Sequence, residues 1–348
     1  MGRPTTCAAI LLSAVLLSGA AFAEPLPAQK SFDDFPGLAG LTRTSLTDRE
    51  GNRLDVLRYA RAERGPAVVI VPGSLCAPLF AALGQPPDVR AFATVPVLKA
   101  AERDALDAHL VYLERRNIVS LQTLASALAF SVDEIFRLSP CSEHNGGLTL
   151  EQRVADVRLQ LQWLKQQDGI EALHLVGVSE GADVVAAVAA ADPGLADSLM
   201  LIGGAGPSQF ADFAAFARGR NDVHGVREAF ADLDRFLTAA APAQYKGYDA
   251  RRWQSFAVRT STLDSLAAST VPVFIAHGDR DTSLPIASAD LAAVELMRKQ
   301  PQRAIFYWSV VDGDHMLKTT RARRLPKILR HYVAWARAAP AGRTFRAD

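Results

Sequence analysis

The chain has 348 residues, of which 49% are apolar and 22% are charged, with 38 Lys and Arg against 37 Asp and Glu. A chain of this length and composition can form one large globular domain or two small ones. The near-zero charge balance argues against a general nucleic-acid binder and against a basic membrane-surface patch.

The first 23 residues have the pattern of a secretory signal peptide. Arg3 supplies a positive charge, residues 8–17 an apolar core and residues 21–23 an A-x-A cleavage site, so we expect the mature chain to begin near Glu24. The apolar run is too short to span a bilayer comfortably, and an uncleaved membrane anchor is the alternative. We therefore expect an exported protein, periplasmic or secreted, without stable membrane insertion.

Two cysteines, Cys76 and Cys141, remain once the signal segment is removed. Export places them in a compartment that permits disulfides, so a bridge between them is the simple hypothesis. Closing a loop of this size stabilises a fold by about 2–4 kcal/mol. Two free, buried thiols are the alternative.

Six short apolar runs predict β-strands that are buried in a sheet, namely residues 67–71, 109–113, 173–176, 199–202, 271–276 and 304–310. Residues 41–46 and 54–59 suggest two further strands, joined by a tight polar turn. Segments with helical spacing separate most of the six runs. Clear helices are predicted from Thr149, with Gln152 completing a capping box, and over 291–297 and 325–337. This order predicts an α/β fold with a mostly parallel sheet, a helical lid over about 206–268 and a flexible tail from about 338.

Residues 177–181 form a G-x-S-x-G motif between the predicted strand 173–176 and an Ala- and Val-rich helix. In this strand–turn–helix setting the turn is so sharp that it raises the serine hydroxyl above the end of the strand. Ser179 is therefore the candidate nucleophile, with the positive end of a helix beneath it. The alternative is a chance pattern in which Ser179 only caps a helix.

A nucleophilic serine needs a base, and the base needs an orienting group. The strands 271–276 and 304–310 end next to candidates for both roles, His277, Asp279 and Asp281 after the first strand and His315 after the second. The carboxyl ends of parallel strands converge on one crevice. We expect His315 to be the base and Asp281 the acid, with Asp279 and His277 as the competing choices.

The G-x-S-x-G motif, the His-Gly-Asp-Arg-Asp loop and the Gly-Asp-His turn, in the chain order Ser179, Asp281, His315, resemble the α/β-hydrolase superfamily over about 41–337. The resemblance implies an eight-stranded, mostly parallel sheet with flanking helices, and it favours Asp281 over Asp279. It also implies an oxyanion hole made by the backbone N–H groups of Glu180 and Ser74. We expect the Glu180 side chain to be a solvated or helix-start carboxylate, with contact to a cationic substrate group as the alternative.

Pro72-Gly73-Ser74-x-Cys76, together with Cys141-Ser142-Glu143, resembles a group of exported bacterial hydrolases of undefined substrate. Pro72 stands where many relatives have histidine, and no H-G-G-G run is present, which argues against a lipase of the hormone-sensitive type.

The leading hypothesis is an exported serine hydrolase that cleaves a carboxylic ester, or a similar acyl bond, of a small molecule through an acyl-enzyme. The sequence has no H-E-x-x-H motif, Cys/His ligand cluster or phosphate-binding glycine loop, so we expect no metal and no organic cofactor. One alternative is a serine aminopeptidase or amidase, although the lid sequence shows no site for a charged terminus. The other is a hydrolase-fold protein that binds a ligand without turnover.

Overall fold

The computed structural model describes residues 32–35, 37–61, 63–75, 77–83, 90–121, 148–238, 242–246, 248–338 and 342–348. The predicted signal segment and both predicted bridge cysteines, Cys76 and Cys141, lie outside these residues. No helix in the described ranges is long and apolar enough to cross a membrane.

A single large sheet organises the fold, and the described residues contribute nine strands to it, in the order β1-β2-β6-β3-β7-β8-β11-β12-β13. Strand β2 runs antiparallel to both of its neighbours, and all other adjacent pairs are parallel. The strands are β1 Leu41–Thr47, β2 Arg53–Tyr59, β3 Gly65–Val71, β6 His109–Leu113, β7 Ile170–Val178, β8 Ser198–Ile202, β11 Val273–Gly278, β12 Ile305–Val310 and β13 Arg343–Ala347. A separate antiparallel hairpin is formed by β4 Phe80–Leu83 and β5 Arg90–Ala93.

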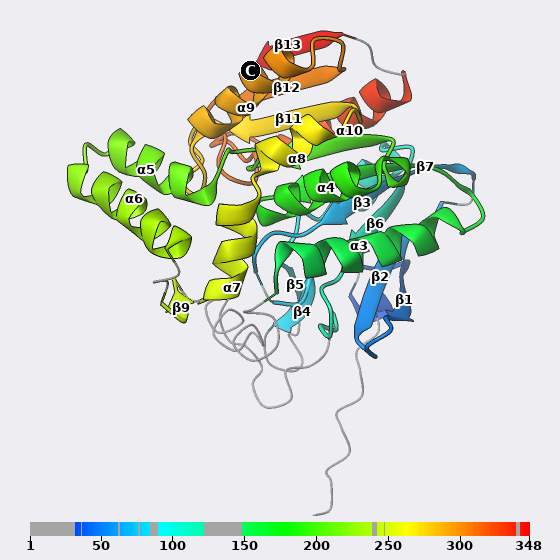
Figure 1. Cartoon of the computed structure of the whole chain (residues 1–348). Coiled ribbons are helices and arrows are strands. Elements are labelled where there is room, and N and C mark those ends of the chain that lie inside the picture. Colours follow the sequence, from blue (N-terminus) through cyan, green and yellow to red (C-terminus); the bar gives the residue numbers. More distant parts are fainter. Residues whose placement is uncertain are drawn as a thin grey trace, which may run out of the picture.

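Helices cover both faces of the sheet, so the domain has three layers (Figure 1). One face carries α3 Leu150–Lys165, α4 Glu180–Ala191, α8 Thr262–Ala268 and α9 Ile286–Lys299, and the other carries α10 Leu325–Arg337. Short helical elements are η1 Phe32–Asp34, α1 Ala100–Asp104 and η3 Pro193–Leu195.

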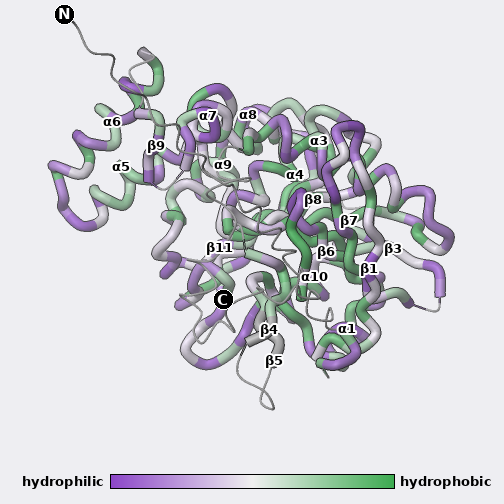
Figure 2. Tube along the Cα trace, turned by 90° about the horizontal axis from the view of Figure 1, so that it is seen from below, coloured by the Kyte–Doolittle hydropathy of each residue, from purple (hydrophilic) through white to green (hydrophobic). Residues whose placement is uncertain are grey.

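Strand β3 shows why the central strands are continuous apolar runs. Ala67, Val69 and Val71 enter the core beneath α3 and α4, whereas Val68 and Ile70 enter the core beneath α10. Every residue of β3 is buried, because successive side chains point to opposite faces and both faces are covered. Figure 2 shows the same concentration of hydrophobic residues along the central strands.

Several predicted helix boundaries are confirmed. Helix α3 begins after Thr149, whose Oγ1 accepts a hydrogen bond from the Gln152 N–H, while Gln152 Oε1 accepts from the Thr149 N–H at 3.0 Å. This reciprocal capping satisfies two donors that a helix start would otherwise leave open. Helix α10 spans the residues that its apolar spacing predicts.

The segment between β8 and β11 is mostly helical. It contains α5 Gln209–Gly219, α6 Val223–Leu237, α7 Ala250–Trp253, the π-helical turn η4 Gln254–Arg259 and α8. A two-residue hairpin, β9 Gln244–Tyr245 with β10 Tyr248–Asp249, is an addition that the sequence pattern does not reveal. Helices α5 and α6 project from the body as an antiparallel pair (Figures 1 and 2). Aromatic side chains join this pair to α7, with the Phe210 and Trp253 ring centres 5.9 Å apart.

The end of the chain differs from the sequence-based expectation. Residues 343–347, which lie in the predicted flexible tail, form β13 and pair in parallel with β12, so the sheet has one strand more than the eight expected. The strand is polar and largely exposed, and Arg346 lies over the ring of Trp308 at 4.2 Å. An exposed edge strand needs no apolar run, which is why its sequence carries no strand signal.

Candidate active site

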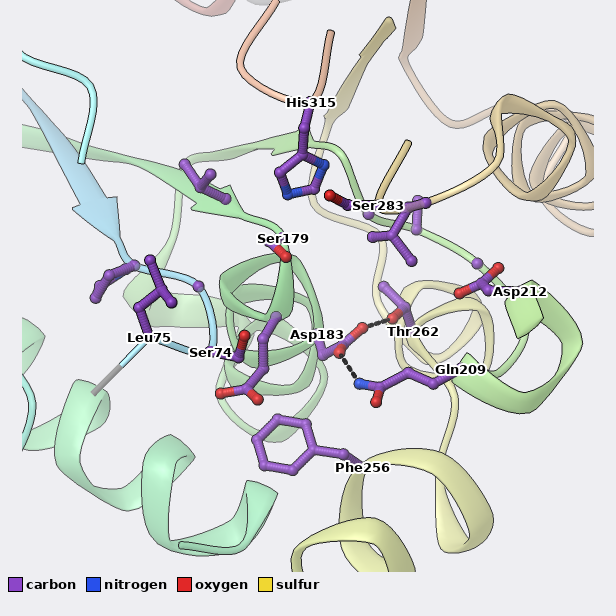
Figure 3. A pocket seen from close by; sticks show the side chains of 18 of the residues that line it. Ser74, Leu75, Ser179, Asp183, Gln209, Asp212, Phe256, Thr262, Ser283 and His315 are labelled. Atoms are coloured by element: carbon purple, nitrogen blue, oxygen red, sulfur yellow. Dashed lines mark hydrogen bonds between the residues drawn. The ribbon is translucent and has the colours of Figure 1, made fainter. Parts of the chain in front are cut away.

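A cavity of about 400 Å³ opens at the carboxyl ends of the parallel strands. Residues after β3, β7, β8, β11 and β12 line it, and the segment between β8 and β11 closes its other side. Ser74, Ser179 and His315 all face this cavity (Figure 3). The crevice therefore lies where an open parallel sheet typically binds its ligand.

Ser179 occupies a sharp turn between β7 and α4, with φ of 56° and ψ of −125°. A positive φ is unusual for a residue other than glycine, so the backbone is strained here. Two glycines allow the turn to pack tightly. A Cβ on Gly177 would lie 2.6 Å from the Ala182 Cα, and one on Gly181 would lie 2.9 Å from the Pro72 carbonyl oxygen.

His315 and Asp281 form a close pair beside Ser179. His315 Nδ1 lies 2.7 Å from Asp281 Oδ2, and the other carboxylate oxygen accepts the N–H groups of Ser283 at 2.7 Å and Leu284 at 2.9 Å. Burial alone would raise the pKa of Asp281, but the hydrogen bond and charge of His315, with these two N–H groups, hold it below its ordinary value. The carboxylate is therefore ionised at neutral pH and fixes the ring of His315, which stands above Ser179 in Figure 3.

The competing choices from the sequence occupy other positions. His277 is fully buried, and its Nε2 lies 2.9 Å from the Leu284 carbonyl oxygen and 3.3 Å from Asp281 Oδ2. Asp279 hydrogen-bonds through its backbone N–H to the Val310 carbonyl and does not line the cavity. His174 is a core residue, as its place within a strand predicts, with Nδ1 2.9 Å from Ser198 Oγ.

Both predicted oxyanion positions lie next to Ser179, the candidate nucleophile. Glu180 is the first residue of α4, where a backbone N–H has no acceptor within the helix. The turn containing Gly73 and Ser74 packs against Ser179, because a Cβ added to Gly73 would lie 3.0 Å from the Ser179 Cβ. Ser74 borders the cavity, and its carbonyl oxygen lies 3.5 Å from the Tyr248 hydroxyl.

Glu180 stands at the start of α4, as one of the expectations has it, but its side chain is not solvated, so the other expectation is wrong. The residue is 5% exposed, and its carboxylate contacts the guanidinium groups of Arg115, Arg153 and Arg252. Burial raises the pKa of Glu180, but the charges of the three arginines outweigh it and bring the pKa to about 2. The three partners come from distant parts of the chain, which is why no local pattern reveals this cluster.

Two further carboxyl groups line the cavity and were not singled out from the sequence. Asp183 accepts hydrogen bonds from Thr262 Oγ1 and, at 3.4 Å, from Gln209 Nε2 (Figure 3), and Asp212 accepts one from Ser288 Oγ. Burial is the main cause that raises the pKa of Asp183 to about 7 and that of Asp212 to about 6. Asp183 comes four residues after Ser179, so helical spacing could have placed it beside the nucleophile.

Within the residues that the structure describes, no group of three or more His, Cys, Asp or Glu side chains is arranged to hold a metal ion.

Comparison with known proteins identifies the fold. No family model and no curated protein matches the sequence. Among solved structures, Est1E from Butyrivibrio proteoclasticus aligns with a TM-score of 0.52 and 13% identity over 86% of this chain and 100% of that one. The α/β hydrolase GrgF from Penicillium sp. sh18 aligns with a TM-score of 0.52 and 13% identity over 86% of this chain and 98% of that one.

A puromycin-hydrolyzing peptidase from Mycobacterium tuberculosis aligns with a TM-score of 0.54 and 13% identity, over 90% of this chain and 41% of that one. The mostly parallel sheet, the strand–turn–helix around Ser179 and these structural likenesses agree. The chain has the fold of the α/β-hydrolase superfamily.

Proposed function

We propose that the protein is a serine hydrolase that cleaves a carboxylic ester, or a similar acyl bond, of a small molecule. One observation carries the proposal: a strained serine at a strand–helix turn lines the same cavity as His315, which is hydrogen-bonded to Asp281. A backbone conformation that costs free energy persists where function requires it. The structural likeness to esterases agrees with this proposal, although at this level of sequence identity it shows only the fold.

In the proposed reaction, His315 Nε2 takes the proton of the Ser179 hydroxyl while the oxygen attacks the substrate carbonyl. The resulting imidazolium is stabilised by Asp281, to which Nδ1–H donates. His315 then gives the proton to the leaving group, and an ester of Ser179 remains. Water, activated by the same histidine, hydrolyses this acyl-enzyme and restores the free serine.

Negative charge develops on the carbonyl oxygen of the substrate during both steps. The backbone N–H groups of Glu180 and Ser74 are the proposed donors to it. Donors that are already in place stabilise this charge without having to reorganise, and the loss of one typically lowers turnover by about 10²–10³.

The cavity walls favour a substrate with an apolar part. Phe213, Trp253 and Phe256 contribute aromatic surface to the side formed by the segment between β8 and β11. A structure of Est1E has ferulic acid bound, and that protein shares 12% identity with this chain. Because Phe213, Trp253 and Phe256 all belong to residues 206–268, we propose that this segment acts as a lid. Its aromatic side chains would help to enclose the acyl group or the leaving group.

One observation favours a second candidate, an aminopeptidase or amidase. Asp183 and Asp212 border the cavity, and a carboxylate is a suitable partner for the ammonium group of an amino-terminal substrate. The lid sequence by itself shows no site for a charged terminus, whereas the structure brings Asp183 of α4 and Asp212 of α5 to one cavity.

A panel of nitrophenyl esters with short and long acyl chains, run beside aminoacyl anilides, distinguishes the candidates. Turnover of esters that is lost in Ser179→Ala is the expected result. Preferential turnover of aminoacyl anilides would select the second candidate. A purified, folded protein that turns over neither class would favour a binding protein without catalysis.

The N-terminal pattern supports the further proposal that the protein acts outside the cytoplasm. Cell fractionation followed by N-terminal sequencing tests it, with a mature end near Glu24 expected. An intact Met1 in the cytoplasmic fraction would contradict the proposal.

A further inference from the structure

The strongest feature outside the catalytic groups is a buried ion cluster at Glu180, the residue that follows the nucleophile. Arg115 Nη2 lies 3.0 Å and Arg153 Nη1 3.3 Å from Glu180 Oε1, while Arg252 Nη2 contacts Glu180 Oε2. All four side chains are at most 5% exposed. A buried carboxylate is stable only when such partners satisfy it.

The same arginines also hold the turn that follows β3. Arg115 Nη2 donates to the carbonyl oxygen of Gly73, and Arg153 Nη2 donates to that of Pro72 at 3.2 Å. Each of these two guanidinium groups therefore links the turn on one side to the Glu180 carboxylate on the other. The turn and the start of α4 are far apart in the sequence, and this cluster joins them.

The geometry of a peptide unit gives these contacts a catalytic consequence. The Gly73 carbonyl and the Ser74 N–H belong to one planar trans peptide, so they point in opposite directions. A guanidinium group that holds the carbonyl oxygen on one side thereby fixes the direction of the N–H on the other. Glu180 carries the second proposed donor on its own backbone. One cluster of side chains thus governs both N–H groups of the oxyanion hole.

Arg252 connects this cluster to the segment between β8 and β11. Its guanidinium carbon lies 4.1 Å from the centre of the Tyr248 ring and 5.1 Å from that of Phe256. Tyr248 in turn reaches the Ser74 carbonyl oxygen at 3.5 Å. The position of α7 is therefore coupled to the same turn that presents the Ser74 N–H.

We propose that the Glu180 carboxylate is a positioning residue for catalysis, which aligns the two oxyanion donors through Arg115 and Arg153 and links them to the proposed lid through Arg252. The inference rests on the proposed hydrolase function and deepens it. Its alternative is a purely structural ion cluster, because buried pairs whose partners are removed destabilise a fold whatever else they do.

The test compares Glu180→Gln and Arg115→Lys with Asp156→Asn. The control breaks the buried ion pair in which Arg116 Nη2 lies 2.5 Å from Asp156 Oδ1. Asp156 lies on α3, as Arg153 does, but its carboxylate contacts neither Glu180 nor the turn. For each variant, kcat and KM for a nitrophenyl ester, the melting temperature and the affinity for a trifluoromethyl ketone are measured. The ketone adds to the nucleophilic serine and forms an oxyanion, so its affinity reports the alignment of the donors.

Glu180→Gln and Arg115→Lys are expected to lower kcat by about 10-fold to 100-fold with little change in KM, because donor alignment matters in the transition state. Ketone affinity should fall by a similar factor. Asp156→Asn should lower the melting temperature while kcat and ketone affinity stay close to wild type.

The proposal would be overturned if kcat fell in all three variants only in proportion to the loss in melting temperature. Unfolding of both cluster variants while Asp156→Asn folds would also overturn it, since that result shows a role in folding alone. Labelling of the wild type by a fluorophosphonate distinguishes a failure of the proposed hydrolase function from a failure of the proposed role of Glu180. Without labelling the hydrolase function itself fails, whereas labelling with unaltered ketone affinity in both variants rejects only the role of Glu180.

Discussion

The Oδ2 atom of Asp281 lies 2.7 Å from His315 Nδ1 and 3.3 Å from the Nε2 atom of His277. Burial lowers the pKa of His277, so this ring is neutral at neutral pH. Its Nε2 also lies 2.9 Å from the Leu284 carbonyl oxygen, in the loop whose backbone N–H groups hold the other oxygen of Asp281. We therefore expect His277 to support Asp281, the proposed acid, instead of serving as the base.

Replacement of His277 by Gln is expected to loosen the Asp281 loop. We expect a loss of about 1–3 kcal/mol in the free energy of unfolding, because buried polar partners are left unsatisfied. A fall in kcat of about 10-fold or more should accompany it, since small displacements of catalytic groups are costly. His174→Gln is the matched control: it removes another buried histidine, hydrogen-bonded to Ser198 within the core, and should lower stability without changing kcat. Equal kcat in the two variants would contradict the supporting role.

Replacement of Asp281 by Asn should lower kcat by about 10⁴, because the orienting carboxylate and the charge that stabilises the imidazolium are both lost. Asp279→Asn, two residues earlier in the same loop, should retain wild-type turnover. Steady-state kinetics of the two variants decide between the acids that the sequence leaves in competition. The opposite ranking would assign the role to Asp279.

The strained backbone of Ser179 predicts a trade-off between stability and activity. Ser179→Gly removes the side chain at a φ of 56° and should raise the free energy of unfolding by about 1 kcal/mol, while it abolishes turnover. Ser179→Ala also abolishes turnover, but because it keeps a Cβ its free energy of unfolding should rise less. Urea denaturation of both variants measures the difference. Equal stability of the two would mean that the turn stores no such strain.

The raised pKa of Asp183 makes stability depend on pH. Its pKa rises from an ordinary value of 3.8 to about 7, mainly through burial. Its contribution is therefore fully present below pH 3.8 and is lost as the pH rises through about 7, where the folded state must hold a buried charge. Because one pKa unit corresponds to about 1.4 kcal/mol, Asp183→Asn should flatten the decline between about pH 4 and pH 7 by on the order of 1–4 kcal/mol. Parallel stability curves for wild type and variant would show that Asp183 does not titrate in this range.

The state of Cys76 and Cys141 remains a prediction, and thiol titration of the denatured, unreduced protein measures it. The absence of free thiols in the mature chain is expected if the two are bridged. Two titratable thiols per mature chain would exclude the bridge.

Local patterns predict much of this fold. The eight predicted strands, the Thr149–Gln152 capping box and the helix over 325–337 all occur where the sequence implies, because strand patterning and helix capping act over a few residues. Strand β13 escapes prediction because an exposed edge can be polar. The short hairpin β9–β10 escapes it because two paired residues carry no periodicity.

The candidate site, like the fold, has one part that local sequence patterns predict and one part that they do not. The strand ends bring His315 to Asp281 and place His315 on the cavity of Ser179, as the order of elements implies. The surroundings of Glu180 depend on Arg115, Arg153 and Arg252, which follow a strand, sit within a helix and belong to the inserted segment, respectively. Only the assembled tertiary structure brings these three together.

The central claim, that Ser179 is a nucleophile activated by His315, is tested most directly by fluorophosphonate labelling of the folded protein with mass-spectrometric mapping of the modified peptide. One label per chain on Ser179 is expected, with labelling lost in Ser179→Ala and strongly slowed in His315→Gln. Labelling that persists in Ser179→Ala, or a folded wild-type protein that takes up no label, would contradict the claim.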